Sequence, residues 1–348
     1  MRLLLLTVAV AGLGALPGLP AQGASFDCAK AATPYETAIC GSDDLSRADD
    51  RLSKTYATAV GGLSDAALSA MRQDQRNWLA FAQRVCTRDA RPLASGTYDQ
   101  RGIDCLVDVF NSRSDVLEMS RMMSGLRFYP VSRYGAAPDP YEADNPDSNW
   151  PVSKQELSVV QIDGDEEFAK TFNTLVREEA HFDAPADAGP EADGDEDASS
   201  DSVNSIGVKE LAGTGRITLT VETYWYGHGA AHGNWGISYR HFLREEGRWL
   251  TASDVFAGKG WQKALLDLTV VALRDEHGDM LMLDDTSYIA DVVTDPVRWD
   301  LSDPYGLVIQ FQPYEVAAYA YGAPTARVSW EALTDYLAEG ADRVRYGW

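Results

Sequence analysis

The sequence predicts a two-domain protein: an all-α N-terminal domain stapled by disulfides, followed by an α+β domain with an antiparallel sheet and packed helices. Three observations support this fold class. All four cysteines lie in the first third of the chain. Apolar residues recur at helical spacing up to residue 118, whereas alternating strands joined by turns, with helices set apart, dominate after residue 154. A chain of 348 residues is also long enough for two cores.

Residues 1–23 have the features of a signal peptide. Arg2 supplies the positive start, an apolar run follows, and the sequence LPAQGA offers small residues for cleavage near Gly23. No later apolar run is long enough to cross a bilayer, so no integral membrane segment is expected. We therefore expect a periplasmic or secreted bacterial protein.

The helical domain, residues 24–125, is predicted to contain four helices. Thr33, Pro34 and Glu36 form a start signal in which threonine caps the helix, proline takes its first position and glutamate reaches back. A second helix begins near Ser42 and ends at the sequence GGLS, residues 61–64. The third and fourth helices are predicted around residues 68–85 and 106–117, with a loop between them.

The four cysteines are predicted to form two disulfides, because an even number in an exported protein is typical of such a framework. Zinc is the alternative, but it requires closer pairs than this sequence provides. Three pairings are possible. We favour Cys28–Cys40 and Cys86–Cys105, because each closes a short local loop.

Residues 126–153 are rich in proline, aspartate and serine and are predicted to be an interdomain linker. The α+β domain, residues 154–348, includes a predicted acidic loop at residues 182–204, since residues 182–201 hold eight acidic residues and no basic one. The predicted strands cover residues 156–162, 216–226, 237–243 and 305–311, and the predicted helices cover residues 165–180, 261–276 and 330–337.

The net charge of −23 is unevenly distributed. Residues 25–121 hold 12 basic and 14 acidic residues, a net of −2, whereas residues 122–348 hold 17 basic and 39 acidic residues, a net of −22. Such a field repels nucleic acid and anionic membranes and attracts cationic partners in a salt-sensitive way. Solubility alone is the other explanation.

No recognised catalytic motif is present: the sequence lacks a G-x-S-x-G elbow, a phosphate-binding loop and an H-E-x-x-H pair. Residues 193–204 resemble a calcium loop at the first, third and fifth positions. They fail at the sixth and twelfth, which are Ala198 and Asn204. We therefore predict a protein that is not an enzyme and that uses no cofactor or metal.

The sequence YWYGHGAAHGNWG, residues 224–236, spaces His228 and His232 four residues apart. On a helix the two rings would share one face, but the surrounding glycines disfavour a helix, which argues against a metal pair. Two interpretations remain. The segment is either a strand connection whose histidines bond the loop or the opposing strand, or a recognition loop that uses its flanking aromatic residues.

Residues 26–118 resemble the domain of LprI-type lysozyme inhibitors. The matching sequences are FDCAKA, YETAICGSDDLSRADDRLSKTY, QRNWLAFAQRVC and CLVDVFNSRSDVLE, which include all four cysteines and the Q-x-x-W-L motif. In the family an arginine commonly lies closer to this tryptophan, so a surface position departs from the pattern. The resemblance implies a disulfide-bonded helical domain that contacts lysozyme.

Residues from about 155 to 335 resemble the lysozyme-sensing extracellular domain of RsiV-type anti-sigma factors, which is also appended to peptidoglycan deacetylases. The matching sequences are YWYGHGAAHGNWG, GRWLTASDVF and GLVIQFQPYEVAAYAYGAPTARVSWEAL. His228 departs from the family pattern and receives no role. No transmembrane helix, sigma-binding segment or deacetylase domain accompanies the match, so those activities are not carried over.

Together the resemblances imply an exported protein that recognises, and inhibits, lysozyme-like muramidases. A glycine-rich loop would enter the substrate cleft and contact its catalytic carboxylates. The alternative is a cell-envelope module that binds peptidoglycan and does not inhibit lysozyme; an unrecognised carboxylate hydrolase is a third hypothesis. The candidate binding residues are Tyr226, His232, Gly233, Asn234 and Trp235.

Overall fold

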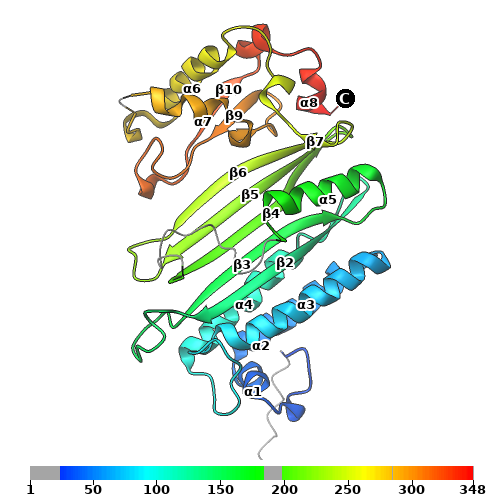
Figure 1. Cartoon of the computed structure of the whole chain (residues 1–348), viewed down its shortest axis with the longest axis vertical. Coiled ribbons are helices and arrows are strands. Elements are labelled where there is room, and N and C mark those ends of the chain that lie inside the picture. The colour runs from blue at the N-terminus through cyan, green and yellow to red at the C-terminus, as the bar shows by residue number, and fades with distance from the viewer. Residues whose placement is uncertain (1–23, 184–197, 284, 348) are drawn as a thin grey trace, which may run out of the picture.

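The computed structural model describes residues 24–183, 198–283 and 285–347, so the predicted signal peptide lies outside the described residues. The predicted fold class is confirmed: a helical region with two disulfides precedes a mixed α+β region with a mostly antiparallel sheet. Figure 1 shows the helices at one end of the molecule, a long sheet in the middle and a smaller mixed layer at the other end. No helix in the described part of the chain is both long and apolar enough to cross a membrane.

The N-terminal region contains helices α1 (Pro34–Gly41), α2 (Asp43–Ala59), α3 (Asp65–Val85) and α4 (Gln100–Leu117). The predicted capping box is present, since the Thr33 side chain accepts from the Glu36 N–H and the Glu36 carboxylate accepts from the Thr33 N–H. Both favoured disulfides, Cys28–Cys40 and Cys86–Cys105, are formed.

A seven-stranded sheet follows, in the order β1 to β7. The pairing of β3 with β4 is parallel and the other pairings are antiparallel. The chain passes between these two strands through α5 (Glu167–Glu179), which buries Phe172 and Val176 against the sheet. The strands are β1 (Met122–Met123), β2 (Leu126–Pro138), β3 (Val152–Ile162), β4 (Ser200–Ala212), β5 (Arg216–Gly227), β6 (Asn234–Leu243) and β7 (Arg248–Trp249).

Two sequence-based expectations are wrong in this region. The first half of the expected linker at residues 126–153 is the 13-residue strand β2, and the expected acidic loop at residues 182–204 already becomes strand β4 at Ser200. Pro130 makes β2 resemble a loop in the sequence, because proline is rare inside strands. The main-chain groups of Phe128 and Ser132 bond outward, away from β3, and Pro130 lies midway between them. A proline there costs the ladder no hydrogen bond.

Helix α3 closes the outer edge of β2. The Ser132 N–H donates to the Asp74 carboxylate at 2.8 Å, and the Arg84 guanidinium donates to the Ala136 carbonyl at 2.8 Å. Below this edge, Arg113 of α4 forms an ion pair of 2.7 Å with Asp74, and both side chains are buried. The helical region is therefore packed on the sheet rather than tethered to it.

The other end of the chain forms a three-stranded sheet, in the order β10-β9-β8, covered by helices. Trp299, Leu307 and Phe311 are fully buried in its core. The expected helix at residues 330–337 is a 3-10 helix, Glu331–Tyr336. The regular elements are α6 (Trp261–His277), α7 (Ala290–Thr294), β8 (Trp299–Asp300), β9 (Gly306–Gln310), β10 (Thr325–Ser329) and α8 (Ala341–Tyr346).

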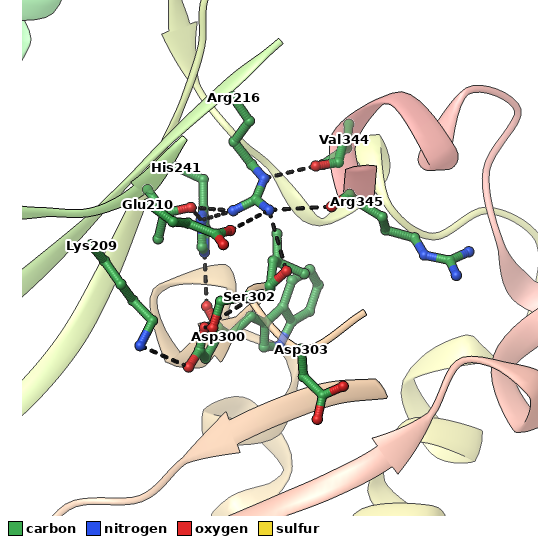
Figure 2. Close-up of polar contacts among 12 residues, drawn as sticks. Lys209, Glu210, Arg216, His241, Asp300, Ser302, Asp303, Val344 and Arg345 are labelled. Atoms are coloured by element: carbon green, nitrogen blue, oxygen red, sulfur yellow. Dashed lines mark hydrogen bonds and ion pairs between the residues drawn. The ribbon is translucent and has the colours of Figure 1, made fainter. Parts of the chain in front are cut away.

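Arg216, at the start of β5, joins the long sheet to this C-terminal layer (Figure 2). Its buried guanidinium donates to the carbonyls of Val344 at 2.7 Å and Leu301 at 3.2 Å, and it pairs with Glu210 at 2.7 Å. Beside it, His241 is buried. Burial, and then repulsion from Arg216, lower the pKa of His241 to about 3, so its ring is neutral and structural.

Candidate partner-binding surface

The five candidate binding residues lie in the loop of residues 228–233 and in the adjoining ends of β5 and β6, and ring packing explains the glycines of this hairpin. A side chain at Gly233 would lie 2.7 Å from the Tyr224 hydroxyl, and one at Gly227 would lie 2.7 Å from the Trp225 ring. Gly229 has a φ of +83°, a conformation that other residues rarely adopt. The glycines therefore let two aromatic rings fold against the hairpin backbone.

His228 belongs to a buried polar network and not to the exposed surface. Its Nδ1 lies 2.6 Å from the Asp139 carboxylate and its Nε2 lies 3.1 Å from the Asp201 carboxylate of β4. The ring stacks on Trp150 and is also near Tyr226. Its side chain is fully buried, so this histidine fastens the loop to the segment before β3.

Asp139 is the centre of that network. It accepts from the Ser199 hydroxyl at 2.7 Å and from the backbone N–H groups of Tyr141 and Glu142, each at 2.8 Å. Burial raises the pKa of Asp139, but these hydrogen bonds, together with the contact to His228, lower it to about 2. The carboxylate is therefore ionised at neutral pH and holds three chain segments together.

His232 faces the opposite way and contacts the segment that follows β9. Its ring stacks on Tyr319 at a centroid distance of 4.0 Å. Its Nδ1 lies 3.0 Å from the Gly233 carbonyl, and because a carbonyl oxygen only accepts, Nδ1 is the donor. In that tautomer Nε2 accepts from the Tyr314 hydroxyl at 3.2 Å. The two histidines of the motif thus have separate partners.

These contacts define an aromatic surface, which we call the hairpin patch: Tyr224, His232, Trp235, Tyr314 and Tyr319. Tyr224 and Trp235 are directly opposite each other on β5 and β6 and are 41% and 37% exposed. Tyr314 is 61% exposed and lies 5.2 Å from Tyr319 between ring centroids. Exposed, pre-ordered aromatic rings are typical of protein-binding surfaces.

Two of the five candidate residues, His232 and Trp235, belong to this patch, and the Gly233 carbonyl accepts a hydrogen bond from the Tyr319 hydroxyl within it. Asn234 is exposed next to them at the first position of β6. Tyr226 is separate, because its ring is half-buried near Trp150 and its hydroxyl donates to the Ala230 carbonyl at 3.1 Å.

Sequence reasoning missed Tyr314 and Tyr319. Both lie in the segment QPYEVAAYAY, whose aromatic residues are spaced too irregularly for a strand or a helix face. This irregular spacing of aromatic residues is the one sequence feature that could have indicated a surface loop here. Nothing local to the sequence indicates that this loop packs beside residues 228–233.

Among the residues that the structure describes, no group of three or more histidine, cysteine, aspartate or glutamate side chains is placed to hold an ion. The arrangement offers ring faces, edges and hydrogen-bonding groups, which suit contact with another molecule.

The architecture thus defines a disulfide-stapled helical domain joined to an α+β domain that exposes an aromatic surface and has no evident catalytic family. Comparison with known proteins names both parts. Residues 28–117 match the family described as lysozyme inhibitor LprI, and residues 289–331 match the family of unknown function DUF3298. The chain therefore has an N-terminal LprI domain and a C-terminal DUF3298 region, which is RsiV-like, as both resemblances predicted.

Solved structures of DUF3298 proteins also match the chain. A member from Bacteroides fragilis has 16% sequence identity and a TM-score of 0.45, and covers 64% of this chain and 96% of its own. A member from Pseudomonas aeruginosa has 13% identity and a TM-score of 0.43, and covers 64% of this chain and 98% of its own. No curated protein matched the chain.

Proposed function

We propose that this protein is an exported inhibitor that binds lysozyme-like muramidases and occludes their substrate cleft. The observation that carries the proposal is the match of residues 28–117 to the lysozyme inhibitor LprI family. The two disulfides that staple this domain also suit a protein that works outside the cytoplasm.

The charge distribution supports a cationic partner. Lysozymes of the animal type are cationic, and residues 122–348 carry a net charge of −22. Such a field accelerates the encounter with a cationic protein and loses its effect as salt screens it. A salt-sensitive association rate is therefore expected.

The hairpin patch is the contact surface that we assign to the C-terminal part. Its aromatic rings are held by stacking and hydrogen bonds before any partner arrives, which reduces the entropy lost on binding. His232, Asn234 and Trp235 would contact the partner directly, and Gly233 would keep the loop backbone close to the rings. Tyr226 would not contact the partner but would hold the loop in place through its hydrogen bond to the Ala230 carbonyl.

The test is inhibition of a cationic animal lysozyme by the chain from residue 24 onward, at about 0.02 M and about 0.2 M salt. We expect stoichiometric inhibition that weakens at the higher salt. The variant Trp235→Ala should weaken binding by about 30-fold or more, because truncating a central aromatic residue typically costs about 2 kcal/mol. Tyr305→Ala, which removes a ring that is 74% exposed outside the patch, is the matched control.

Absence of binding to several lysozyme types in low-salt calorimetry would overturn the proposal. A pull-down with purified peptidoglycan separates the alternative function. Retention on peptidoglycan without any effect on lysozyme would identify an envelope-binding module instead.

A further inference from the structure

The helical domain contains a cavity of about 390 Å³. Its walls come from α1, α2 and α3, and Phe110 of α4 also lines it. The Cys28–Cys40 disulfide ties the N-terminal segment, which supplies Phe26, to α1, which supplies Tyr35. The cavity is more than 80 residues away in sequence from the hairpin patch, and no residue is shared between the two.

The charges around this cavity are all of one sign. Its lining includes the carboxylates of Glu36 and Asp49 and no lysine, arginine or histidine. Backbone N–H groups of Ala32 and Thr33 donate to Glu36 and lower its pKa, so this carboxylate is ionised at neutral pH.

Asp49 is the unusual member. It is only 8% exposed and accepts one hydrogen bond, from the Ser25 N–H at 2.6 Å, but it has no ion-pair partner among the described residues. The other buried aspartate of this domain, Asp74, has Arg113 at 2.7 Å. Buried carboxylates in proteins are normally paired, so the contrast indicates that the cation for Asp49 comes from outside the chain.

The rest of the wall suits a cation as well. The rings of Tyr35, Tyr56 and Trp78 line the cavity, and aromatic faces attract lysine and arginine groups. The Tyr35 hydroxyl and the Trp78 Nε1 have no hydrogen-bond partner among the described residues. Burial, and then the Asp49 carboxylate, raise the pKa of Tyr35, which places the two groups in the same electrostatic environment.

We propose that this cavity, the Asp49 pocket, receives a lysine or arginine side chain of the cationic protein partner. The inference rests on the proposed function for the identity of that partner. A neutral sugar would leave the carboxylate without a counter-charge, whereas a guanidinium or ammonium group supplies both charge and donors. The LprI domain would thus anchor the partner through one side chain, while the hairpin patch makes the second contact.

The experiment measures binding of the chain from residue 24 onward to a cationic animal lysozyme, and separately to the probe N-acetyl-arginine amide. The test variant is Asp49→Asn, which keeps the shape and the acceptor for Ser25 but removes the charge. The matched control is Asp50→Asn, since Asp50 is the next residue, has its own partner Lys54 at 2.6 Å and does not line the cavity. Both variants change the net charge equally, so general steering is the same in each.

We expect Asp49→Asn to weaken lysozyme binding at least tenfold and to abolish saturable probe binding, while Asp50→Asn stays within twofold of the parent. Equal affinities for lysozyme in the two variants would overturn the pocket and leave the proposed function intact. If the parent chain bound no lysozyme, the proposed function would fail, and loss of probe binding in Asp49→Asn alone would still support the cation pocket. If the parent chain showed no saturable binding of the probe, the proposal of a cation-binding Asp49 pocket would be overturned.

Discussion

Replacing Arg113 by methionine should sharply destabilise the contact between the helical domain and the sheet. The Arg113 side chain is fully buried and pairs with Asp74 at 2.7 Å. It also donates to the Gln75 side chain at 3.0 Å and to the Tyr134 hydroxyl at 2.9 Å. The methionine fills most of the space but leaves Asp74 without a counter-charge.

The magnitude follows from that uncompensated charge. Removing one partner of a buried ion pair typically costs about 3–5 kcal/mol. In the variant, Asp74 keeps only the hydrogen bond from the Ser132 N–H, so we expect a loss in this range. Asp74→Asn in the Arg113→Met background removes the orphaned charge, and the double variant should be less destabilised than the sum of the two single variants.

The assay is urea-induced unfolding followed by circular dichroism at neutral pH. Arg47→Met is the control, because Arg47 and Asp44 form an ion pair whose side chains are 68% and 74% exposed. An exposed pair of this kind contributes about 1 kcal/mol or less. If Arg113→Met cost no more than this control, or if the two substitutions were additive, the buried pair would not hold the domains together.

Three further outcomes are expected. Replacing Cys86 and Cys105 by alanine should lower the free energy of unfolding by about 3 kcal/mol, because the disulfide no longer restricts the unfolded chain. Calorimetry measures this change, and an unchanged value would show that the disulfide does not stabilise the domain. Because the folded-state pKa of His241 is depressed to about 3, stability should be full above its ordinary pKa and fall as the pH drops from 6.5 toward 3, a slope that His241→Gln should flatten. Gly233→Ala should displace the Tyr224 ring and change near-ultraviolet circular dichroism, whereas an unaltered spectrum would show that the ring does not pack there.

Local signals predicted the helical domain well. The capping box at Thr33 and Glu36 and the short loops closed by the cysteines depend on neighbours within about 20 residues, and the structure confirms them. The strand β2 was missed because Pro130 normally signals a break. Its tolerance depends on which edge of the strand faces β3, and that is a property of the assembled sheet.

For the same reason, only the hairpin side of the candidate surface could be predicted from the sequence. The sequence of residues 224–236 indicates a turn rich in glycine and aromatic residues. The residues that contact this turn, Tyr314 and Tyr319, lie about 80 residues later in the chain. Their approach is set by Gln312, whose amide bonds both the N–H and the carbonyl of Ile237 on the outer edge of β6. A side-chain amide that substitutes for a neighbouring strand has no local sequence signature.

Gln312 bonds main-chain groups on the outer edge of β6, and side chains of α3 do the same on the outer edge of β2. An open edge is a template on which another chain can add a strand, and that is a common start of fibril growth. On β2 the cover is a helix whose C-terminal end is fastened by the Cys86–Cys105 disulfide. We therefore expect this disulfide to help keep the β2 edge covered, and its reduction to make that edge more accessible to another chain.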